Sequence, residues 1–187
     1  MSNKAKIRML IIFFIILALI LICIVGYVVL KKKFPLRYED LIVRYAAEYD
    51  LAPSLVATVI WAESGYRPEV TSHRGAVGLM QIMPETGEWI AGKLGVSDYK
   101  EEQLKDPNTN IMFGCWYLSF LKERFLEDEV KILAAYNAGQ DRVAEWEETW
   151  GEGHLPDADD IPFEETKKYV GKIQKAKKLY QVLYKLR

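Results

Sequence analysis

The chain has 187 residues, of which 50% are hydrophobic and 27% are charged, and its formal net charge is -1. The charge is uneven, because residues 1–37 hold seven basic and no acidic side chains, which leaves residues 38–187 with a net charge of -8. Residues 38–187 are numerous enough and rich enough in Tyr and Trp to bury a hydrophobic core, which excludes a disordered chain. The net negative charge of this part argues against nucleic-acid binding. We therefore expect one folded domain behind an apolar, basic N-terminal segment.

The N-terminal segment contains 22 residues without a charge, from Met9 to Leu30. As a helix this run spans about 33 Å at ~1.5 Å per residue, enough for a hydrocarbon core of ~30 Å. It predicts a cytoplasmic tail at 1–8, a transmembrane signal anchor at 9–30 and a basic tether at 31–37. A cleaved signal peptide would have a shorter apolar run followed by a cleavage site, and none follows Leu30. Basic residues flank both ends, so charge alone does not orient the span.

Beyond the tether, the spacing of apolar residues predicts a mainly α-helical domain over residues 38–187 with at most a short hairpin. Glycines and Pro68 interrupt the pattern between residues 65 and 81, which indicates a loop. The expected helices cover 38–49, a segment from Pro53 to the stop at Gly65, a segment from Pro84, 108–125, 129–139, a shorter one through Val143 and Trp146, and a basic amphipathic helix at 163–187; residues 151–162 form a surface loop.

The side chains that bind metals or form disulfides are few. Cys23 lies in the apolar run and Cys115 in a helical apolar pattern, so no disulfide framework is expected and Cys115 is interpreted as a core residue. His73 and His154 have no cysteine or second histidine at ligand spacing, and no nucleotide-binding string is present. We expect neither a metal nor a cofactor.

The most informative single residue is Glu63. It lies seven positions after Val56, and therefore continues the apolar face of the helix that begins at Pro53. Burial and the negative end of the helix dipole both raise the pKa of a carboxyl group, as a general acid requires near neutral pH. The periodicity alone also allows a frayed terminal glutamate that reaches solvent.

Three strings set this chain apart from a generic helical domain. They are AESGYRP at 62–68 followed by SHRGAVGLMQIMP at 72–84, AAYNAG at 134–139, and IPFEET at 161–166. In this order the strings resemble the lytic transglycosylases of the soluble (SLT) type, relatives of the goose-type lysozymes. The resemblance covers roughly residues 38–180 and implies an α+β lysozyme-like fold with an active-site groove.

The resemblance also implies the site residues. Glu63 is expected to be the single catalytic acid and base, and Ser72 and Gln81 to contact the N-acetyl and ring substituents of a sugar. Tyr136 is expected to place a hydroxyl beside the scissile bond, Asn137 to contact substrate, and Glu165 to be a groove residue rather than a nucleophile. The alternatives are structural: Ser72 as a turn residue and Tyr136 as a core aromatic.

The implied reaction is cleavage of the β-1,4 bond between N-acetylmuramic acid and N-acetylglucosamine in peptidoglycan, with 1,6-anhydromuramoyl ends as product. A lone glutamate suits a substrate-assisted route, in which the sugar does part of the work of a second carboxylate. Two alternatives remain open: a lysozyme-type hydrolase, with Glu69 or Glu85 holding a water, and a non-catalytic scaffold that grips glycan for an envelope machine.

The substrate then predicts location and partners. Peptidoglycan lies outside the cytoplasmic membrane, so the domain is expected to be extracytoplasmic on a single-pass anchor, with glycan strands and the membrane as its partners. The seven-residue tether reaches about 25 Å when extended, at ~3.5 Å per residue, which confines cleavage to the wall near the membrane. The lysines of the last helix are interpreted as a solvated face.

Overall fold

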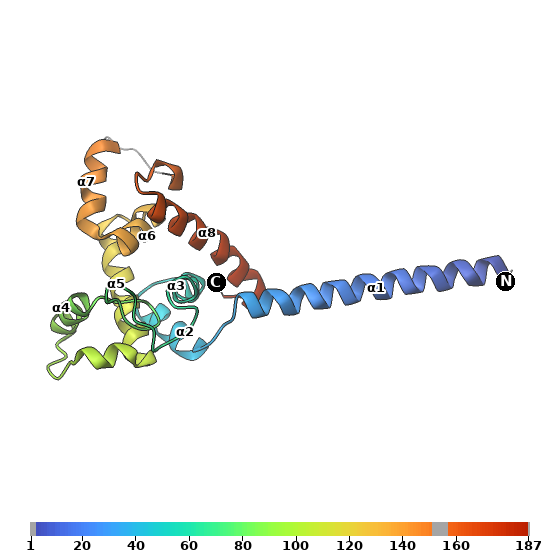
Figure 1. Ribbon diagram of the computed structural model, residues 1–187, viewed down its shortest axis with the longest axis horizontal. Helices are drawn as coiled ribbons and strands as arrows, with labels where there is room; N and C mark the ends of the chain where they lie inside the picture. The colour runs from blue at the N-terminus through green and yellow to red at the C-terminus, as the bar shows by residue number, and fades with distance from the viewer. Residues whose placement is uncertain (1–2, 151–156, 187) are drawn as a thin grey trace. The chain divides into compact units, whose positions relative to one another are not determined.

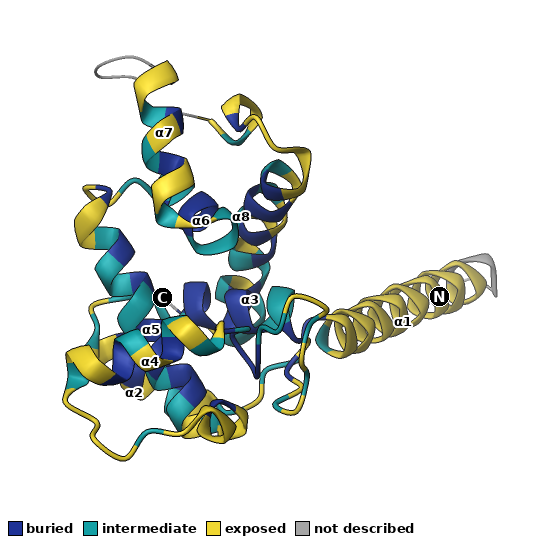
Figure 2. Cartoon of the chain, turned by 60° about the vertical axis from the view of Figure 1, so that its left-hand side comes forward, coloured by how far each residue is buried: buried dark blue, intermediate teal, exposed yellow. Residues whose placement is uncertain are grey.

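The computed structural model describes residues 3–150 and 157–186, and it divides the chain into two compact units between Pro35 and Leu36. The first unit consists mainly of helix α1 (Asn3–Lys33), whose apolar side chains are exposed along its length (Figures 1 and 2). Among the described residues, α1 is the helix that is long and apolar enough to cross a membrane, over Lys6–Lys33.

Helix α1 includes part of the expected tether. Lys31, Lys32 and Lys33 are helical, and the backbone N–H of Phe34 still donates to the Leu30 carbonyl at 2.8 Å. Lysine is a good helix former, and its charge is favourable at a helix C-terminus, so the helix continues until Pro35 disfavours it. The reach expected for seven extended residues therefore overestimates the length of the tether, because three of them are helical.

The second unit, residues 36–187, is the domain, and its described part is helical without a β-sheet, as expected. Its helices are α2 (Glu39–Glu48), α3 (Pro53–Glu63), α4 (Pro84–Leu94), α5 (Pro107–Arg124), α6 (Glu129–Ala138), α7 (Gln140–Trp150) and α8 (Glu164–Tyr184). Two 3₁₀ turns, Glu101–Lys105 and Ala158–Asp160, were not expected from apolar spacing.

The helices begin where local chemistry favours a first turn. Pro53, Pro84 and Pro107 occupy first-turn positions, where the missing N–H costs nothing. The Asp106 side chain accepts from the Thr109 N–H at 2.8 Å and so caps α5. The last helix ends at Tyr184, earlier than expected, because Lys185 takes a left-handed conformation with φ of 56°.

Helix α3 is the centre of the domain. Every residue from Ser54 to Ile60 is buried, and α3 packs against α2 on one side and most extensively against α8 (Figures 1 and 2). Helix α6 packs against α5, α7 and α8. Cys115 on α5 is a fully buried core residue with a free thiol, as its sequence pattern predicts. The helix at the centre of the domain thus ends at Glu63.

The loop between α3 and α4 contains the short hairpin that the glycines allow. It makes two isolated antiparallel bridges, Thr71 with Val77 and Val77 with Ile82. Of the expected surface loop at 151–162, residues 151–156 lie outside the described residues, and the described remainder contains the second 3₁₀ turn.

Candidate active site

A cleft of about 360 Å³ lies at the end of α3. Its walls come from the α3–α4 loop, from α6 and from the start of α8. The residues that line it are Glu63, Ser72, His73, Arg74, Ala76, Gln81, Met83, Tyr136, Asn137 and Glu165. All six residues proposed from the sequence therefore lie at one cleft, although they are up to 102 positions apart in the chain.

Glu63 is the last residue of α3 and is half-buried. Desolvation by burial is the largest influence on its carboxyl group and raises the pKa, while interactions with the Tyr169 hydroxyl and the Lys172 ammonium lower it in part. The net direction is upward. The fold therefore excludes the alternative that the periodicity left open, in which Glu63 is a frayed terminal residue that faces solvent.

Two tyrosines from different helices accompany the Glu63 carboxyl. The Tyr136 hydroxyl donates to the Met80 carbonyl at 2.8 Å, and burial, followed by the charge of Glu63, raises the pKa of Tyr136. Burial and the Glu63 charge also raise the pKa of Tyr169, whose buried hydroxyl has no hydrogen bond of regular geometry in the described part of the chain. Both phenols stay protonated near the carboxyl.

The sequence pattern did not single out Tyr169 or Lys172 as site residues. Both lie on α8, where Tyr169 fits a buried position and Lys172 a solvated face. The Lys172 ammonium donates to the Ala62 carbonyl at 3.1 Å and lies 4.7 Å from the Trp61 ring centroid. It thereby holds α8 against the last turn of α3. Only the packing of these two helices reveals the contact with Glu63.

The loop presents Ser72 and Gln81 to the cleft through its own hydrogen bonds. The Ser72 hydroxyl oxygen accepts from the Ala76 N–H at 3.0 Å, so this residue does shape a turn while it lines the cleft. The Gln81 amide donates to the carbonyls of Gly78 and Val70 at 2.9 and 3.1 Å. Because the amide nitrogen is occupied, the amide oxygen is the group that Gln81 can offer to a ligand.

Asn110 on α5, which sequence reasoning missed, holds this loop from beneath. Its buried side chain accepts from the Met80 N–H at 2.7 Å and donates to the carbonyls of Leu104 and Val77 at 2.7 and 3.0 Å. Gly78 lies directly above with φ of 83°, and a Cβ there would overlap the Asn110 amide and the Leu104 carbonyl. The buried glycine thus permits the close approach of loop and helix.

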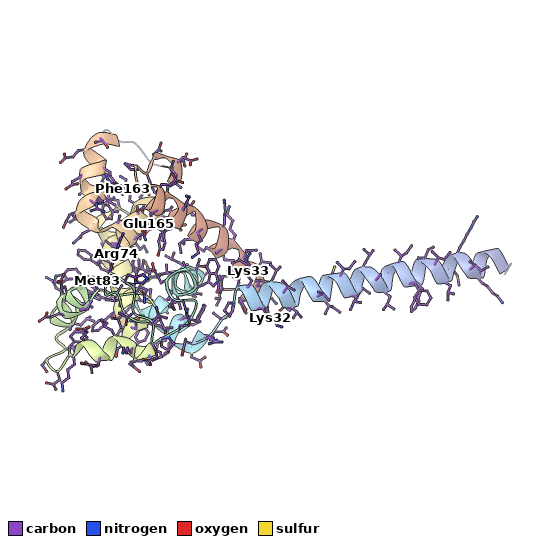
Figure 3. All side chains as sticks on the ribbon, in the orientation of Figure 1. Lys32, Lys33, Arg74, Met83, Phe163 and Glu165 are labelled. Atoms are coloured by element: carbon purple, nitrogen blue, oxygen red, sulfur yellow. The ribbon has the colours of Figure 1, made fainter. Side chains whose placement is uncertain are left out.

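The other wall is more exposed. The Asn137 side-chain oxygen accepts from the Thr166 hydroxyl at 2.9 Å, which leaves the Asn137 amide N–H groups as donors. Glu165 and Arg74 form an ion pair of 3.7 Å with side chains 74% and 82% exposed, so it contributes little to stability. Figure 3 shows Glu165, Arg74 and Met83 in succession from the start of α8 toward α4.

The fold and this cleft define the domain as lysozyme-like, with one half-buried carboxyl at the end of a core helix. The family model of the transglycosylase SLT domain matches residues 40–154. The chain belongs to this family.

Similar proteins agree with that assignment. A soluble lytic murein transglycosylase of Salmonella typhimurium is 38% identical over 146 residues, which are 75% of this chain and 22% of that protein. A membrane-bound lytic murein transglycosylase C of Actinobacillus pleuropneumoniae is 29% identical over 129 residues, which are 64% of this chain and 34% of that protein. The chain thus spans about a fifth to a third of the length of these relatives.

Solved structures show the same fold. The lytic transglycosylase Slt of Pseudomonas aeruginosa, as an inactive variant, superposes with a TM-score of 0.76 at 32% identity, over 82% of this chain and 25% of that one. The 70 kDa soluble lytic transglycosylase of Escherichia coli gives the same TM-score and coverage at 35% identity. The predicted fold class is therefore confirmed.

Proposed function

We propose that residues 38–187 form a peptidoglycan lytic transglycosylase, which cleaves the β-1,4 bond between N-acetylmuramic acid and N-acetylglucosamine and leaves 1,6-anhydromuramoyl ends. The observation that carries the proposal is the Glu63 carboxyl, half-buried in the cleft with a raised pKa. The names of the relatives support the substrate class.

The arrangement of carboxylates favours substrate assistance. A two-carboxylate glycosidase needs its second carboxylate close to the sugar, on the other side of the bond. Among the residues that line the cleft, the other carboxylate is Glu165, which is 74% exposed and paired with Arg74. Glu69 and Glu85, which would hold a water in a hydrolase, do not line this cleft. The hydrolase alternative therefore finds no support in the described residues.

The reaction proceeds in two proton transfers. Glu63 first donates its proton to the glycosidic oxygen, whose bond to C1 of the muramoyl residue breaks, while the 2-acetamido carbonyl of the same sugar stabilises C1. The resulting Glu63 carboxylate then accepts the proton of the C6 hydroxyl, and the C6 oxygen bonds to C1. The acid is regenerated and no water is consumed. The Tyr136 hydroxyl, held by the Met80 carbonyl, lies beside this carboxyl.

Mass analysis of the released fragments tests the proposal. Purified full-length protein in detergent is incubated with peptidoglycan, and the muropeptides are measured by mass spectrometry. The transglycosylase yields anhydro ends, which are lighter by one water than the reducing ends of a hydrolase. Reducing ends alone would establish a muramidase, and intact glycan strands would leave a non-catalytic scaffold.

The Tyr169 hydroxyl predicts a pH effect. Its interaction lowers the pKa of Glu63, because it favours the charged carboxylate. Tyr169→Phe should therefore raise that pKa further and move the alkaline limb of the pH–rate profile, where the catalytic proton is lost, to higher pH. Tyr99→Phe is the matched control, because Tyr99 is not among the groups that shift Glu63. An alkaline limb that stays in place or moves to lower pH would contradict this account of the carboxyl.

We infer a single-pass topology for the anchor. The proposed boundaries are a cytoplasmic tail at 1–8, a span at 9–30, a tether at 31–37 and an extracytoplasmic domain at 38–187. The apolar α1 and the existence of membrane-bound relatives support anchoring, and the substrate supports the outward orientation.

Protease added to intact spheroplasts checks the topology. The domain should be digested while the N-terminal tail stays protected, as detected by tags at the two ends of the chain. Survival of the domain until the membrane is lysed would reverse the orientation and remove the proposed activity with it. Release of the domain into the medium without its first 30 or so residues would mean a signal peptide, and only the anchor would be withdrawn.

A further inference from the structure

Charge is segregated along the domain. Residues 38–165 contain 10 basic and 26 acidic side chains, a net charge of -16, whereas residues 166–187 contain eight basic side chains and no acidic one. The basic stretch coincides with helix α8 and the residues that follow it. The domain is therefore strongly dipolar, with α8 as its positive side.

The lysines of α8 differ in whether the domain itself neutralises them. Four of them have partners inside the domain: Lys167, Lys168 and Lys177 form ion pairs, and Lys172 donates to a backbone carbonyl. Three of these partners are carboxylates, which offset the positive charge where they lie. The charge that remains for an outside partner is in the second half of the helix.

The second half of α8 presents an unpaired basic face. Lys175, Lys178 and Lys185 are exposed and have neither a hydrogen bond nor an ion pair with any residue that the structure describes. Val182, which is 78% exposed, follows Lys178 by four residues and precedes Lys185 by three, the spacing of neighbours on one side of a helix. We call these four residues the lysine face.

The lysine face lies at the end of α8 that is close to the beginning of the domain. The buried Tyr66 hydroxyl, which donates to the Ala57 carbonyl at 3.1 Å, marks this meeting point. Burial raises the pKa of Tyr66, and interactions with Tyr180 and Tyr184 on α8, then with Glu39 at the start of α2, raise it further. The last turns of α8 and the first turn of α2 are thus within electrostatic range of the same hydroxyl.

The chain itself limits how far the start of α2 can lie from the membrane. Residues 31–38 connect the proposed span to α2, and the first three of them are helical. They reach about 22 Å at most, at ~1.5 Å per helical and ~3.5 Å per extended residue, and the headgroup layer fills about 5–8 Å of that distance. The end of α8 is therefore held near the headgroups.

We propose that the lysine face binds the anionic phospholipid headgroups of the membrane that anchors α1, and so sets which side of the domain faces the membrane. The inference rests on the proposed anchor topology and differs from the solvated face that the sequence suggests. A negative surface attracts unpaired lysines and repels the acidic remainder of the domain, so both forces favour the same orientation. The basic residues of the tether outnumber Glu39 and Asp40, the acidic residues of the first turn of α2.

Quenching of a fluorescent probe on the lysine face tests the contact in the full-length protein. Val182→Cys carries the dye, and Cys23→Ala leaves it as the accessible thiol, because Cys115 is fully buried. The protein is reconstituted in phosphatidylcholine vesicles, with or without phosphatidylglycerol, that contain a lipid with a quencher on its headgroup. Quenching should appear with phosphatidylglycerol and be lost in about 1 M salt, where the Debye length falls to about 3 Å.

Substitution of the three lysines provides the second arm. Lys175→Gln, Lys178→Gln and Lys185→Gln together should abolish the quenching in anionic vesicles. The matched control combines three exposed lysines from α4 and the first 3₁₀ turn, which pack against α5 rather than α8: Lys93→Gln, Lys100→Gln and Lys105→Gln. This control has the same net charge and should keep the quenching. Neither set lines the cleft, so both proteins should release fragments from purified peptidoglycan at the unmodified rate.

A dye on the opposite part of the domain shows whether the orientation is specific. Ser97→Cys lies in the exposed loop after α4, and its dye should stay unquenched in the same anionic vesicles. Quenching at both dye positions would mean that the domain contacts the membrane without a preferred side, which overturns the proposal.

The remaining outcomes separate the lysine face from the anchor and from the reaction. Protein that does not float with the vesicles overturns the anchor together with the lysine face. Protein that floats but is not quenched, or is quenched equally in neutral vesicles or in the α8 variant, overturns the lysine face alone. If the α8 variant instead loses binding to purified walls that carry anionic polymers, the partner is the wall and not the membrane. Anhydro muropeptides from the same preparations leave the proposed reaction standing in each case.

Discussion

Glu63→Gln is expected to lower the rate of glycan cleavage by about 10²–10⁴-fold, the usual contribution of a general acid and base. The amide has the size of the carboxyl but can neither donate an acidic proton to the glycosidic oxygen nor accept one from the C6 hydroxyl. Because no other half-buried carboxyl lines the cleft among the described residues, no neighbour can replace it. The rate of release of soluble fragments from purified peptidoglycan measures the effect.

The matched control is Glu69→Gln. Glu69 lies six residues further along the chain, is exposed and does not line the cleft, so its loss should leave the rate unchanged. Binding of chito-oligosaccharides by Glu63→Gln should persist, which distinguishes lost chemistry from a lost site. Turnover close to that of the unmodified protein would show that Glu63 is not the acid.

Glu63→Gln should also change how the stability of the folded protein depends on pH. The folded protein holds the Glu63 pKa above its unfolded value of about 4.3, so it binds this proton more tightly than the unfolded chain does. Stability is therefore lost as the pH rises from the unfolded pKa through the folded pKa. Glutamine does not ionise, so the variant does not lose this stability as the pH rises. The Tm of Glu63→Gln should therefore exceed that of the unmodified protein at neutral pH. The difference should disappear below about pH 4. A Tm that is lower in the variant at neutral pH would contradict a pKa raised by burial.

Asn110→Ala is expected to lower the free energy of unfolding by about 4 kcal/mol. The substitution leaves the Met80 N–H and the carbonyls of Val77 and Leu104 buried without their hydrogen-bond partner. Each such buried, unpaired group costs about 1–3 kcal/mol. The loop that carries Gln81 also loses its support, so activity should fall although the cleft residues are unchanged. Urea denaturation gives the free energy.

Asn108→Ala is the control for Asn110→Ala. Asn108 lies on the same helix, is exposed, and accepts one hydrogen bond, from the Tyr45 hydroxyl at 2.8 Å. The loss of this hydrogen bond should lower the free energy of unfolding by about 1 kcal/mol and leave activity unchanged. Equal costs for the two asparagines would mean that Asn110 is not the support of the loop.

Much of the fold could be predicted from the sequence because its signals are local. Prolines in the first turn mark the starts of α3, α4 and α5, and the spacing of seven residues between Val56 and Glu63 places the carboxyl on the buried side of α3. The apolar run likewise predicts a helix long enough to cross a membrane. Backbone hydrogen bonds and side-chain periodicity act within a few residues, so these features need no knowledge of the rest of the chain.

The surroundings of Glu63 were decided only by the tertiary structure. Tyr169 and Lys172, more than 100 positions later in the chain, face the carboxyl because α8 packs along α3. Asn110 supports the loop across 30 positions, and its sequence neighbours give no sign of this, since a buried asparagine and a solvated one look alike in a helical pattern. Such contacts depend on how the helices dock, and docking is set by the fit of whole apolar faces rather than by any local spacing.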